Sequence, residues 1–259
     1  MKKILLGLFF LLILHQSSKA FMTKVDSIYY GRFGKVMLYY TAKVPHSVVL
    51  FISGDGGWNH GVVNMGKYMA FQGALVLGID AKVYKQNLSK WRVSCYNLTD
   101  DFLGLSNFIQ EKYHFVVHVK PIMMGYSYGA TLAYGIVAQA PKHTFLGTIV
   151  LGFCPDIELD KPLCEGMGIH QHVLQPGVSF DLDRFNGFAD LFIVINGIKD
   201  ETCPIEATQT FLKGLKNVDL MVLKKVGHGF SIADNWLPHF KFAYQQIANI
   251  TEASLLKPK

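Results

Sequence analysis

Continuous apolar runs recur along the chain, and each ends near glycine, aspartate or asparagine. Six of them predict strands, over residues 48–52, 74–79, 121–124, 147–151, 191–195 and 220–223. Unbroken apolar runs are typical of strands that are buried on both faces. Helical spacing lies between them, over residues 100–113, 130–139, 205–215 and 234–247. The alternation predicts an α/β fold in which helices cover both faces of a mostly parallel sheet.

Two regions add to this pattern. Residues 27–30 and 36–40 surround Gly31 and Gly34, which predicts an N-terminal antiparallel hairpin at the sheet edge. Residues 154–188 show weak periodicity, and a loop of this length in a compact domain is usually functional. We expect one α/β domain over residues 21–259 with an irregular, lid-like insertion at about 154–188.

The first 20 residues have the pattern of an export signal. Lys2 and Lys3 precede an apolar run over residues 4–14, and Ala20 closes a stretch of small and polar residues. The run is too short to cross about 30 Å of hydrocarbon as a helix. We therefore predict a signal peptide that is cleaved after Ala20, with a retained membrane anchor as the alternative.

Charge and composition narrow the possible partners. The formal charge is +6, and the signal peptide would remove three lysines and no acidic residue, which leaves +3. The basic residues are not clustered, so nucleic-acid binding is not indicated, whereas weak attraction to anionic lipid is compatible with this charge.

Four cysteines are present, at positions 95, 154, 164 and 203. An even number in an exported chain indicates disulfides rather than free thiols. Cys154 and Cys164 flank a short loop and are the favoured pair, which would leave Cys95 to pair with Cys203. No C-x-x-C spacing is present, so a zinc site is poorly supported.

The strongest chemical signal is Gly125-Tyr126-Ser127-Tyr128-Gly129, which matches G-x-S-x-G between a strand and a helix. This motif exposes a nucleophilic serine on a sharp turn. Asp200 and His228 follow later strands in the order that this fold type uses, so we predict a Ser127, His228 and Asp200 catalytic triad.

Other residues compete for these roles. Glu201 could replace Asp200 as the acid, although its side chain should point elsewhere, and His239 is expected in the middle of a helix. His170 and His172 could bind a metal, contact substrate or be solvated, but no third ligand is apparent. We expect no metal and no cofactor.

Acyl transfer also requires N–H donors that face the oxyanion. The backbone N–H of Tyr128 is one candidate, because it follows the nucleophile. The glycine-rich segment 53–58 follows the first central strand, and the N–H of Gly56 or Asp55 should supply the second donor.

These motifs resemble one protein family. The segments Gly54-Asp55-Gly56-Gly57-Trp58, Gly125 to Ala130 and Cys154 to Cys164 are similar to the bacterial virulence protein family VirJ/AcvB, and the similarity runs from about residue 48 to 247. Members often carry a doubled histidine before a phenylalanine, whereas this chain has Gly227-His228-Gly229-Phe230.

The resemblance implies a periplasmic α/β hydrolase that cleaves lysyl-phosphatidylglycerol and related aminoacylated lipids at the membrane surface. The ammonium groups of such a substrate need acidic partners. Candidates are Asp55 and, in the insertion, Asp156, Asp181 and Asp183. The candidate substrate-binding residues are Asp55, Trp58, Tyr126 and Asp156. Two alternatives remain, namely a periplasmic binding or chaperone-like protein with partners in secretion, and a general carboxylesterase or peptidase.

Overall fold

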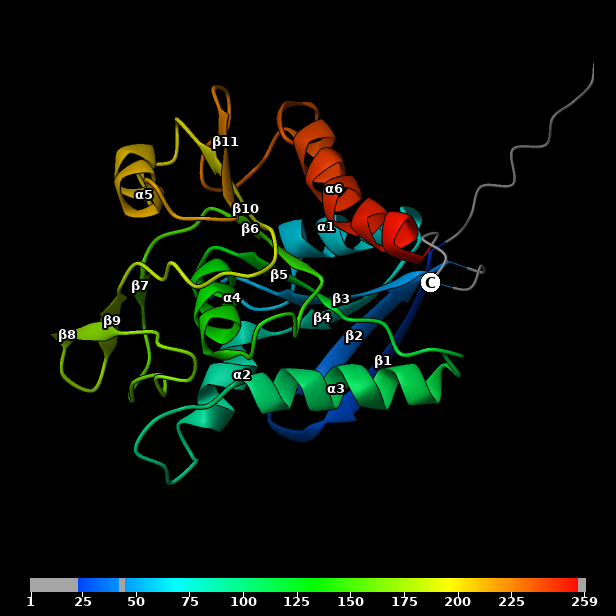
Figure 1. Ribbon diagram of the computed structural model, residues 1–259, viewed down its shortest axis with the longest axis horizontal. Coiled ribbons are helices and arrows are strands. Elements are labelled where there is room, and N and C mark those ends of the chain that lie inside the picture. Colours follow the sequence, from blue (N-terminus) through cyan, green and yellow to red (C-terminus); the bar gives the residue numbers. More distant parts are fainter. Residues whose placement is uncertain (1–22, 42–44, 256–259) are drawn as a thin grey trace, which may run out of the picture.

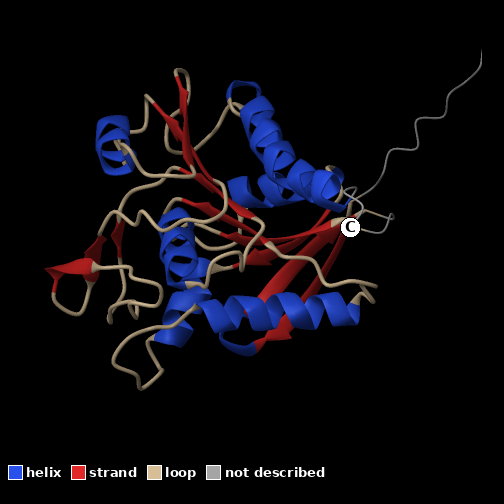
Figure 2. Cartoon of the chain, in the orientation of Figure 1, coloured by secondary structure: helices blue, strands red, loops and turns tan. Residues whose placement is uncertain are grey.

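A central eight-stranded sheet organises the chain in the computed structural model, which describes residues 23–41 and 45–255 (Figures 1 and 2). The predicted signal peptide, residues 1–20, lies outside these described residues. The strands are β1 (Lys24–Tyr30), β2 (Gly34–Tyr40), β3 (Ser47–Ile52), β4 (Ala74–Ile79), β5 (Ile122–Tyr126), β6 (Gly147–Leu151), β10 (Phe192–Gly197) and β11 (Val218–Leu223). Their order is β1-β2-β4-β3-β5-β6-β10-β11.

The sheet is parallel from β4 to β11, and β1 and β2 add an antiparallel hairpin at its edge. All residues of β3, β4, β6 and β10 are buried, which explains why the apolar runs of the sequence are continuous. The predicted α/β class, the six strands and the hairpin are therefore confirmed.

Helices cover both faces of the sheet. On one face, α1 (His60–Phe71) and α6 (Leu237–Leu255) pack against side chains such as Val49 and Phe51. On the other, α2 (Ala81–Leu88), α3 (Thr99–Lys112) and α4 (Tyr128–Gln139) pack against Leu50 and Ile52, and α5 (Ile205–Leu212) contributes Leu212 to the same core. Figure 1 shows α1 and α6 on the side of the sheet opposite α3 and α4.

Two short 3-10 turns complete the helical structure, η1 (Gly31–Phe33) and η2 (Ala233–Asn235). The last helix begins at Leu237, after η2, whereas the sequence pattern predicted that Asp234 would cap it.

The insertion over residues 154–188 contains more regular structure than predicted. It holds β7 (Asp156–Ile157), β8 (Gln171–Gln175) and β9 (Ser179–Leu182), which form a separate antiparallel sheet in the order β7-β9-β8. This small sheet projects from the body of the molecule beyond α4 (Figure 1).

The topology determines where a site can form. The parallel strands β5, β6, β10 and β11 all end at the same sheet edge, and the loops that follow them carry the candidate catalytic residues. Within residues 23–41 and 45–255, no helix is long and apolar enough to cross a membrane.

Candidate active site

Ser127 occupies a sharp turn between β5 and α4, with φ 54° and ψ −123°. A side-chain-bearing residue rarely adopts this conformation, so the surrounding packing must hold it. A Cβ on Gly125 would collide with the carbonyl oxygen of Gly129, and a Cβ on Gly129 would collide with the backbone of β3. The two glycines of the motif therefore allow the close approach that presents Ser127 at the sheet edge.

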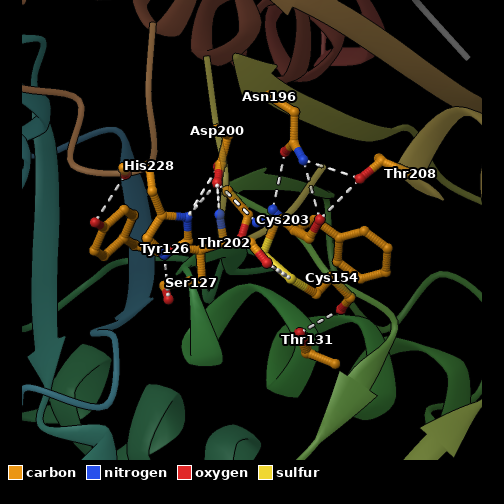
Figure 3. The surroundings of a disulfide bond; sticks show 12 residues. Tyr126, Ser127, Thr131, Cys154, Asn196, Asp200, Thr202, Cys203, Thr208 and His228 are labelled. Atoms are coloured by element: carbon orange, nitrogen blue, oxygen red, sulfur yellow. Dashed lines mark hydrogen bonds and ion pairs between the residues drawn. A yellow bond between two sulfur atoms is a disulfide. The ribbon is translucent and has the colours of Figure 1, made fainter. Parts of the chain in front are cut away.

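Three side chains from distant parts of the sequence form one hydrogen-bonded chain (Figure 3). Ser127 Oγ lies 2.8 Å from His228 Nε2, and His228 Nδ1 lies 2.9 Å from Asp200 Oδ2. A carboxylate can only accept, so the proton of the neutral ring is on Nδ1 and Nε2 is free to accept the serine proton.

The surrounding backbone holds Asp200, the acid of this hydrogen-bonded chain, in place. The Asp200 side chain is fully buried, whereas His228 keeps 21% of its side chain exposed. The backbone N–H groups of Thr202 and Cys203 donate to Asp200 Oδ1 at 3.0 and 2.8 Å. Hydrogen bonds to a carboxylate are strong because they are charge-assisted. Glu201 is exposed, so the structure places Asp200, not its neighbour, beside the histidine.

Tyr126 holds the other side of the histidine. Its hydroxyl donates to the backbone carbonyl of His228 at 3.0 Å, and its ring lies 5.7 Å from the imidazole. Burial, followed by the charges of Asp200 and Asp55, raises the pKa of Tyr126, which keeps the hydroxyl protonated as a donor. Tyr126 thus contacts the base, and the substrate contact expected for it stays a prediction.

The candidate oxyanion donors lie beside Ser127. Tyr128 is the first residue of α4, where a backbone N–H has no partner within the helix. Gly54 to Gly57 form a turn closed by a 3.1 Å hydrogen bond, and a Cβ on Gly54 would lie 3.4 Å from Ser127 Cβ. Asp55 lines the cavity at Ser127, whereas Gly56 does not, so Asp55 is the better-placed second donor.

Two cavities meet at this position. The smaller, of about 160 Å³, is lined by Asp55, Ser127, Tyr128, Thr131, Cys154, Asp156, Glu158, Thr202 and Cys203. The larger, of about 450 Å³, lies between α2 and the insertion and shares Asp55, Tyr128 and Glu158 with the first. Asp55 and Asp156 therefore lie where a substrate at Ser127 would be.

The other acidic candidates lie farther into the insertion. Asp181 pairs with Asp156 in the small sheet, and burial followed by the neighbouring carboxylates raises the pKa of Asp181. Asp183 Oδ1 lies 3.1 Å from His172 Nε2. Neither Asp181 nor Asp183 lines the cavity at Ser127.

Trp58 has a packing role in the structure, and the substrate contact expected for it stays a prediction. Its partly buried indole packs edge-on against Phe51 and donates to the Tyr39 hydroxyl at 2.9 Å. Its backbone N–H donates to Asp80. Trp58 therefore anchors the glycine-rich turn to the sheet, and a large aromatic in such a turn is as consistent with packing as with binding.

The favoured disulfide pairing is wrong. The bonds join Cys95 to Cys164 and Cys154 to Cys203. Cys154 follows β6 and Cys203 follows the neighbouring strand β10, so the topology brings them together. Cys164 donates its backbone N–H to the Tyr96 carbonyl, which places it beside Cys95. Adjacency of the strands, not separation along the sequence, determines the pairing.

The other candidate histidines lie outside the site. His170, His172 and His239 are exposed, and His172 Nε2 lies 3.1 Å from Asp183 Oδ1. In the part of the chain that the structure describes, one group of side chains is close enough together to bind a metal ion, namely Asp200, Cys203 and His228. The Cys203 sulfur is in a disulfide and the other two residues bond to each other, so this group does not fit a metal.

Several solved structures share this fold. The esterase domain of a Rhodothermus marinus protein aligns with a TM-score of 0.58 at 13% identity, covering 88% of this chain and 98% of that one. A putative dienelactone hydrolase from Klebsiella pneumoniae aligns with a TM-score of 0.56 at 11% identity, covering 88% and 97%. A dienelactone hydrolase from Anabaena variabilis gives 0.56 at 16%, covering 86% and 95%. These similarities establish the α/β-hydrolase fold.

The comparison with family models identifies the chain's relatives. A search of curated proteins finds no significant match. The model described as bacterial virulence protein (VirJ) matches residues 46–220, more than half of the chain. The match includes Ser127 and Asp200 and ends before His228, whose place in the site depends on the geometry alone. The chain belongs to the VirJ family of bacterial virulence proteins.

Proposed function

We propose that this protein is a serine hydrolase that cleaves carboxylic esters with Ser127 as nucleophile, His228 as base and Asp200 as the orienting acid. The proposal depends chiefly on the continuous hydrogen-bond chain from the strained Ser127 through His228 to buried Asp200. A binding protein needs no such hydrogen-bond chain, whereas in a hydrolase each of the three residues serves a step of acyl transfer.

In the acylation step, Ser127 Oγ attacks the ester carbonyl carbon while His228 Nε2 takes the hydroxyl proton. Asp200 stabilises the imidazolium that forms. The N–H groups of Tyr128 and Asp55 would donate to the oxygen that becomes negative. Collapse of the tetrahedral intermediate breaks the ester C–O bond, and His228 gives its proton to the departing alcohol.

In the deacylation step, a water molecule takes the place of the alcohol. His228 removes one of its protons as the water oxygen attacks the acyl-Ser127 carbonyl carbon. The second intermediate collapses by breaking the bond to Ser127 Oγ, and His228 returns the proton to that oxygen. The products are a carboxylic acid, an alcohol and the free enzyme.

The proposed substrate is the aminoacyl ester of aminoacylated phosphatidylglycerol, notably lysyl-phosphatidylglycerol. The family resemblance suggests it, and the charge near Ser127 supports it. Asp55 and Asp156 line the cavity at the nucleophile, and carboxylates complement an aminoacyl ammonium group. Glu158 lines it too, but its carboxylate forms a 2.9 Å ion pair with Lys85. In Asp55→Asn we expect the KM for a lysyl ester to rise several-fold, because one charge partner is lost. An unchanged KM would remove Asp55 from this role.

The insertion supports action at a lipid surface. Val173, Leu174 and Val178 at the tip of its hairpin are about half exposed, at 58%, 57% and 43%. Val178 also lines the larger cavity, so the apolar tip borders the path to Ser127. Two disulfides suit an oxidising compartment, and we propose the periplasm as the site of action.

Hydrolysis of small soluble esters is the second candidate. The cavity at Ser127 holds only about 160 Å³, which suits a small acyl group. Proteins of the same fold include an esterase domain and dienelactone hydrolases.

One assay separates these functions. Purified protein is incubated with vesicles that contain lysyl-phosphatidylglycerol and, separately, with p-nitrophenyl acetate, with Ser127→Ala as the control. We expect Ser127-dependent release of lysine. Turnover of the plain ester alone would favour the second candidate, and no turnover of either would favour a binding protein.

A further inference from the structure

The Cys154–Cys203 disulfide lies within the candidate active site (Figure 3). Both cysteines line the cavity that contains Ser127. The bond joins the loop after β6 to the loop after β10, which carries the proposed acid Asp200. Strand β6 lies between β10 and β5, the strand that leads to Ser127. The second disulfide, Cys95–Cys164, is not part of this cavity wall.

One end of the bond is linked directly to the acid. Cys203 is buried, with 4% of its surface exposed, and its N–H donates to Asp200 Oδ1 at 2.8 Å. The adjacent Thr202 N–H donates to the same oxygen. The backbone at the disulfide therefore supplies two of the donors that hold the carboxylate in place against His228.

The other end is fixed to the rigid part of the fold. The Cys154 carbonyl accepts a 2.6 Å hydrogen bond from Thr131 Oγ1 on α4, the helix that begins after Ser127. Buried Asn196 bonds both the N–H and the carbonyl of Phe153, the residue before Cys154. Cys154 is thus a fixed point to which the covalent bond ties the 200–203 segment.

We infer that the Cys154–Cys203 disulfide is a positioning element of the triad, and that it holds the 200–203 segment so that Asp200 stays on His228 Nδ1. This role rests on the proposed hydrolase function. Without the bond, the Thr202 and Cys203 donors are tied only by noncovalent contacts. Asp200 then samples positions away from the imidazole, and fewer enzyme molecules hold the productive tautomer.

The chain contains a matched control for this inference. We compare Cys154→Ser/Cys203→Ser with Cys95→Ser/Cys164→Ser. The two disulfides span 49 and 69 residues, so similar losses of chain-entropy stabilisation are expected from each pair of substitutions. A difference in catalysis between the variants therefore reports position within the site, not global stability.

The measurement is kcat and KM for p-nitrophenyl acetate at a temperature where circular dichroism shows both variants folded. We expect Cys154→Ser/Cys203→Ser to lower kcat about 10- to 100-fold, and the control to retain kcat within about twofold. In an Asp200→Asn background, loss of the Cys154–Cys203 bond should change kcat by less than about twofold, because the bond acts through Asp200.

The outcomes distinguish this inference from the function on which it rests. Absence of Ser127-dependent turnover in the wild type would refute the hydrolase and the inference together. Wild-type turnover with equal kcat in the two double variants would refute the inference alone. The inference would also be refuted if removing the Cys154–Cys203 bond lowered kcat as much in the Asp200→Asn background as in the wild type.

A second measurement applies if a double variant fails to fold. The wild-type protein is partly reduced with a thiol, the freed cysteines are alkylated, and mass spectrometry gives the open fraction of each disulfide. We expect activity to fall with opening of Cys154–Cys203 and to be independent of Cys95–Cys164. Full activity with Cys154–Cys203 open would overturn the inference.

Discussion

Replacing Asp200 with asparagine should uncouple the proposed triad without disturbing the fold. One carboxylate oxygen accepts from the Thr202 and Cys203 N–H groups, and an amide oxygen can do the same. The amide NH₂ then occupies the Oδ2 position, 2.9 Å from His228 Nδ1. Nδ1 also lies 3.0 Å from the retained oxygen, but that oxygen already accepts from two backbone N–H groups. The repulsion between two facing donors therefore moves the ring proton to Nε2, and Nδ1 accepts from the NH₂.

The expected loss of kcat follows from the changed tautomer of His228. With its proton moved to Nε2, His228 donates to Ser127 instead of accepting from it and cannot act as the base. The same substitution in a serine protease triad lowers kcat by about 10⁴-fold, which corresponds to about 5.4 kcal/mol of transition-state stabilisation. We expect a loss of this order for Asp200→Asn.

The assay is kcat for p-nitrophenyl acetate, with thermal unfolding by circular dichroism as a test of the fold. Glu201→Gln is the matched control, since it also neutralises a carboxylate but at an exposed neighbouring position. We expect Glu201→Gln to keep kcat within about twofold. A drop of less than tenfold in Asp200→Asn, with the fold intact, would refute the reasoning.

Three further predictions concern the support of His228, the buried Asn196 and the tip of the insertion. Tyr126→Phe removes the hydroxyl that donates to the His228 carbonyl, and we expect kcat to fall several-fold and unfolding free energy to drop by about 1 kcal/mol. No change in either quantity would show that this hydrogen bond does not hold the histidine. Asn196→Ala leaves the buried N–H of Phe153 without its partner, while the Phe153 carbonyl keeps its 3.0 Å hydrogen bond from Thr208 Oγ1. Urea unfolding should show a loss of about 2–4 kcal/mol. A loss below about 1 kcal/mol would contradict the importance of these bonds. Val173→Ser/Leu174→Ser makes the insertion's tip polar, so vesicle binding and lysyl-phosphatidylglycerol turnover should fall while p-nitrophenyl acetate turnover stays constant. Equal turnover of the lipid by this variant and the wild type would remove the tip from substrate access.

The features predictable from sequence are those that depend on the central sheet. Continuous burial of β3, β4, β6 and β10 leaves an unbroken apolar run for each strand. Parallel strands end at one edge, so a Ser127, Asp200 and His228 order along the chain was enough to predict that these residues meet. The comparisons with known proteins establish the fold and the family, whereas the meeting of these three residues depends on the geometry of the structure.

Two of the missed features carried a sequence signal, whereas the disulfide pairing depends on a contact that sequence spacing does not encode. The β8–β9 hairpin was missed, although Pro176-Gly177 between two apolar runs is a turn signal. Helix α2 was also missed, although Asp80 caps it by accepting from the Val83 N–H at 3.0 Å. The disulfide pairing needed the adjacency of β6 and β10, which follows from strand order and not from the number of intervening residues.

The central claim is that Ser127 is an activated nucleophile, and covalent labelling tests it most directly. The purified protein is treated with a fluorophosphonate, and intact-mass measurement and peptide mapping locate the adduct. We expect one adduct, on Ser127, that is absent from Ser127→Ala and forms far more slowly in His228→Ala. An unlabelled wild-type protein, or an adduct that persists in Ser127→Ala, would contradict the account.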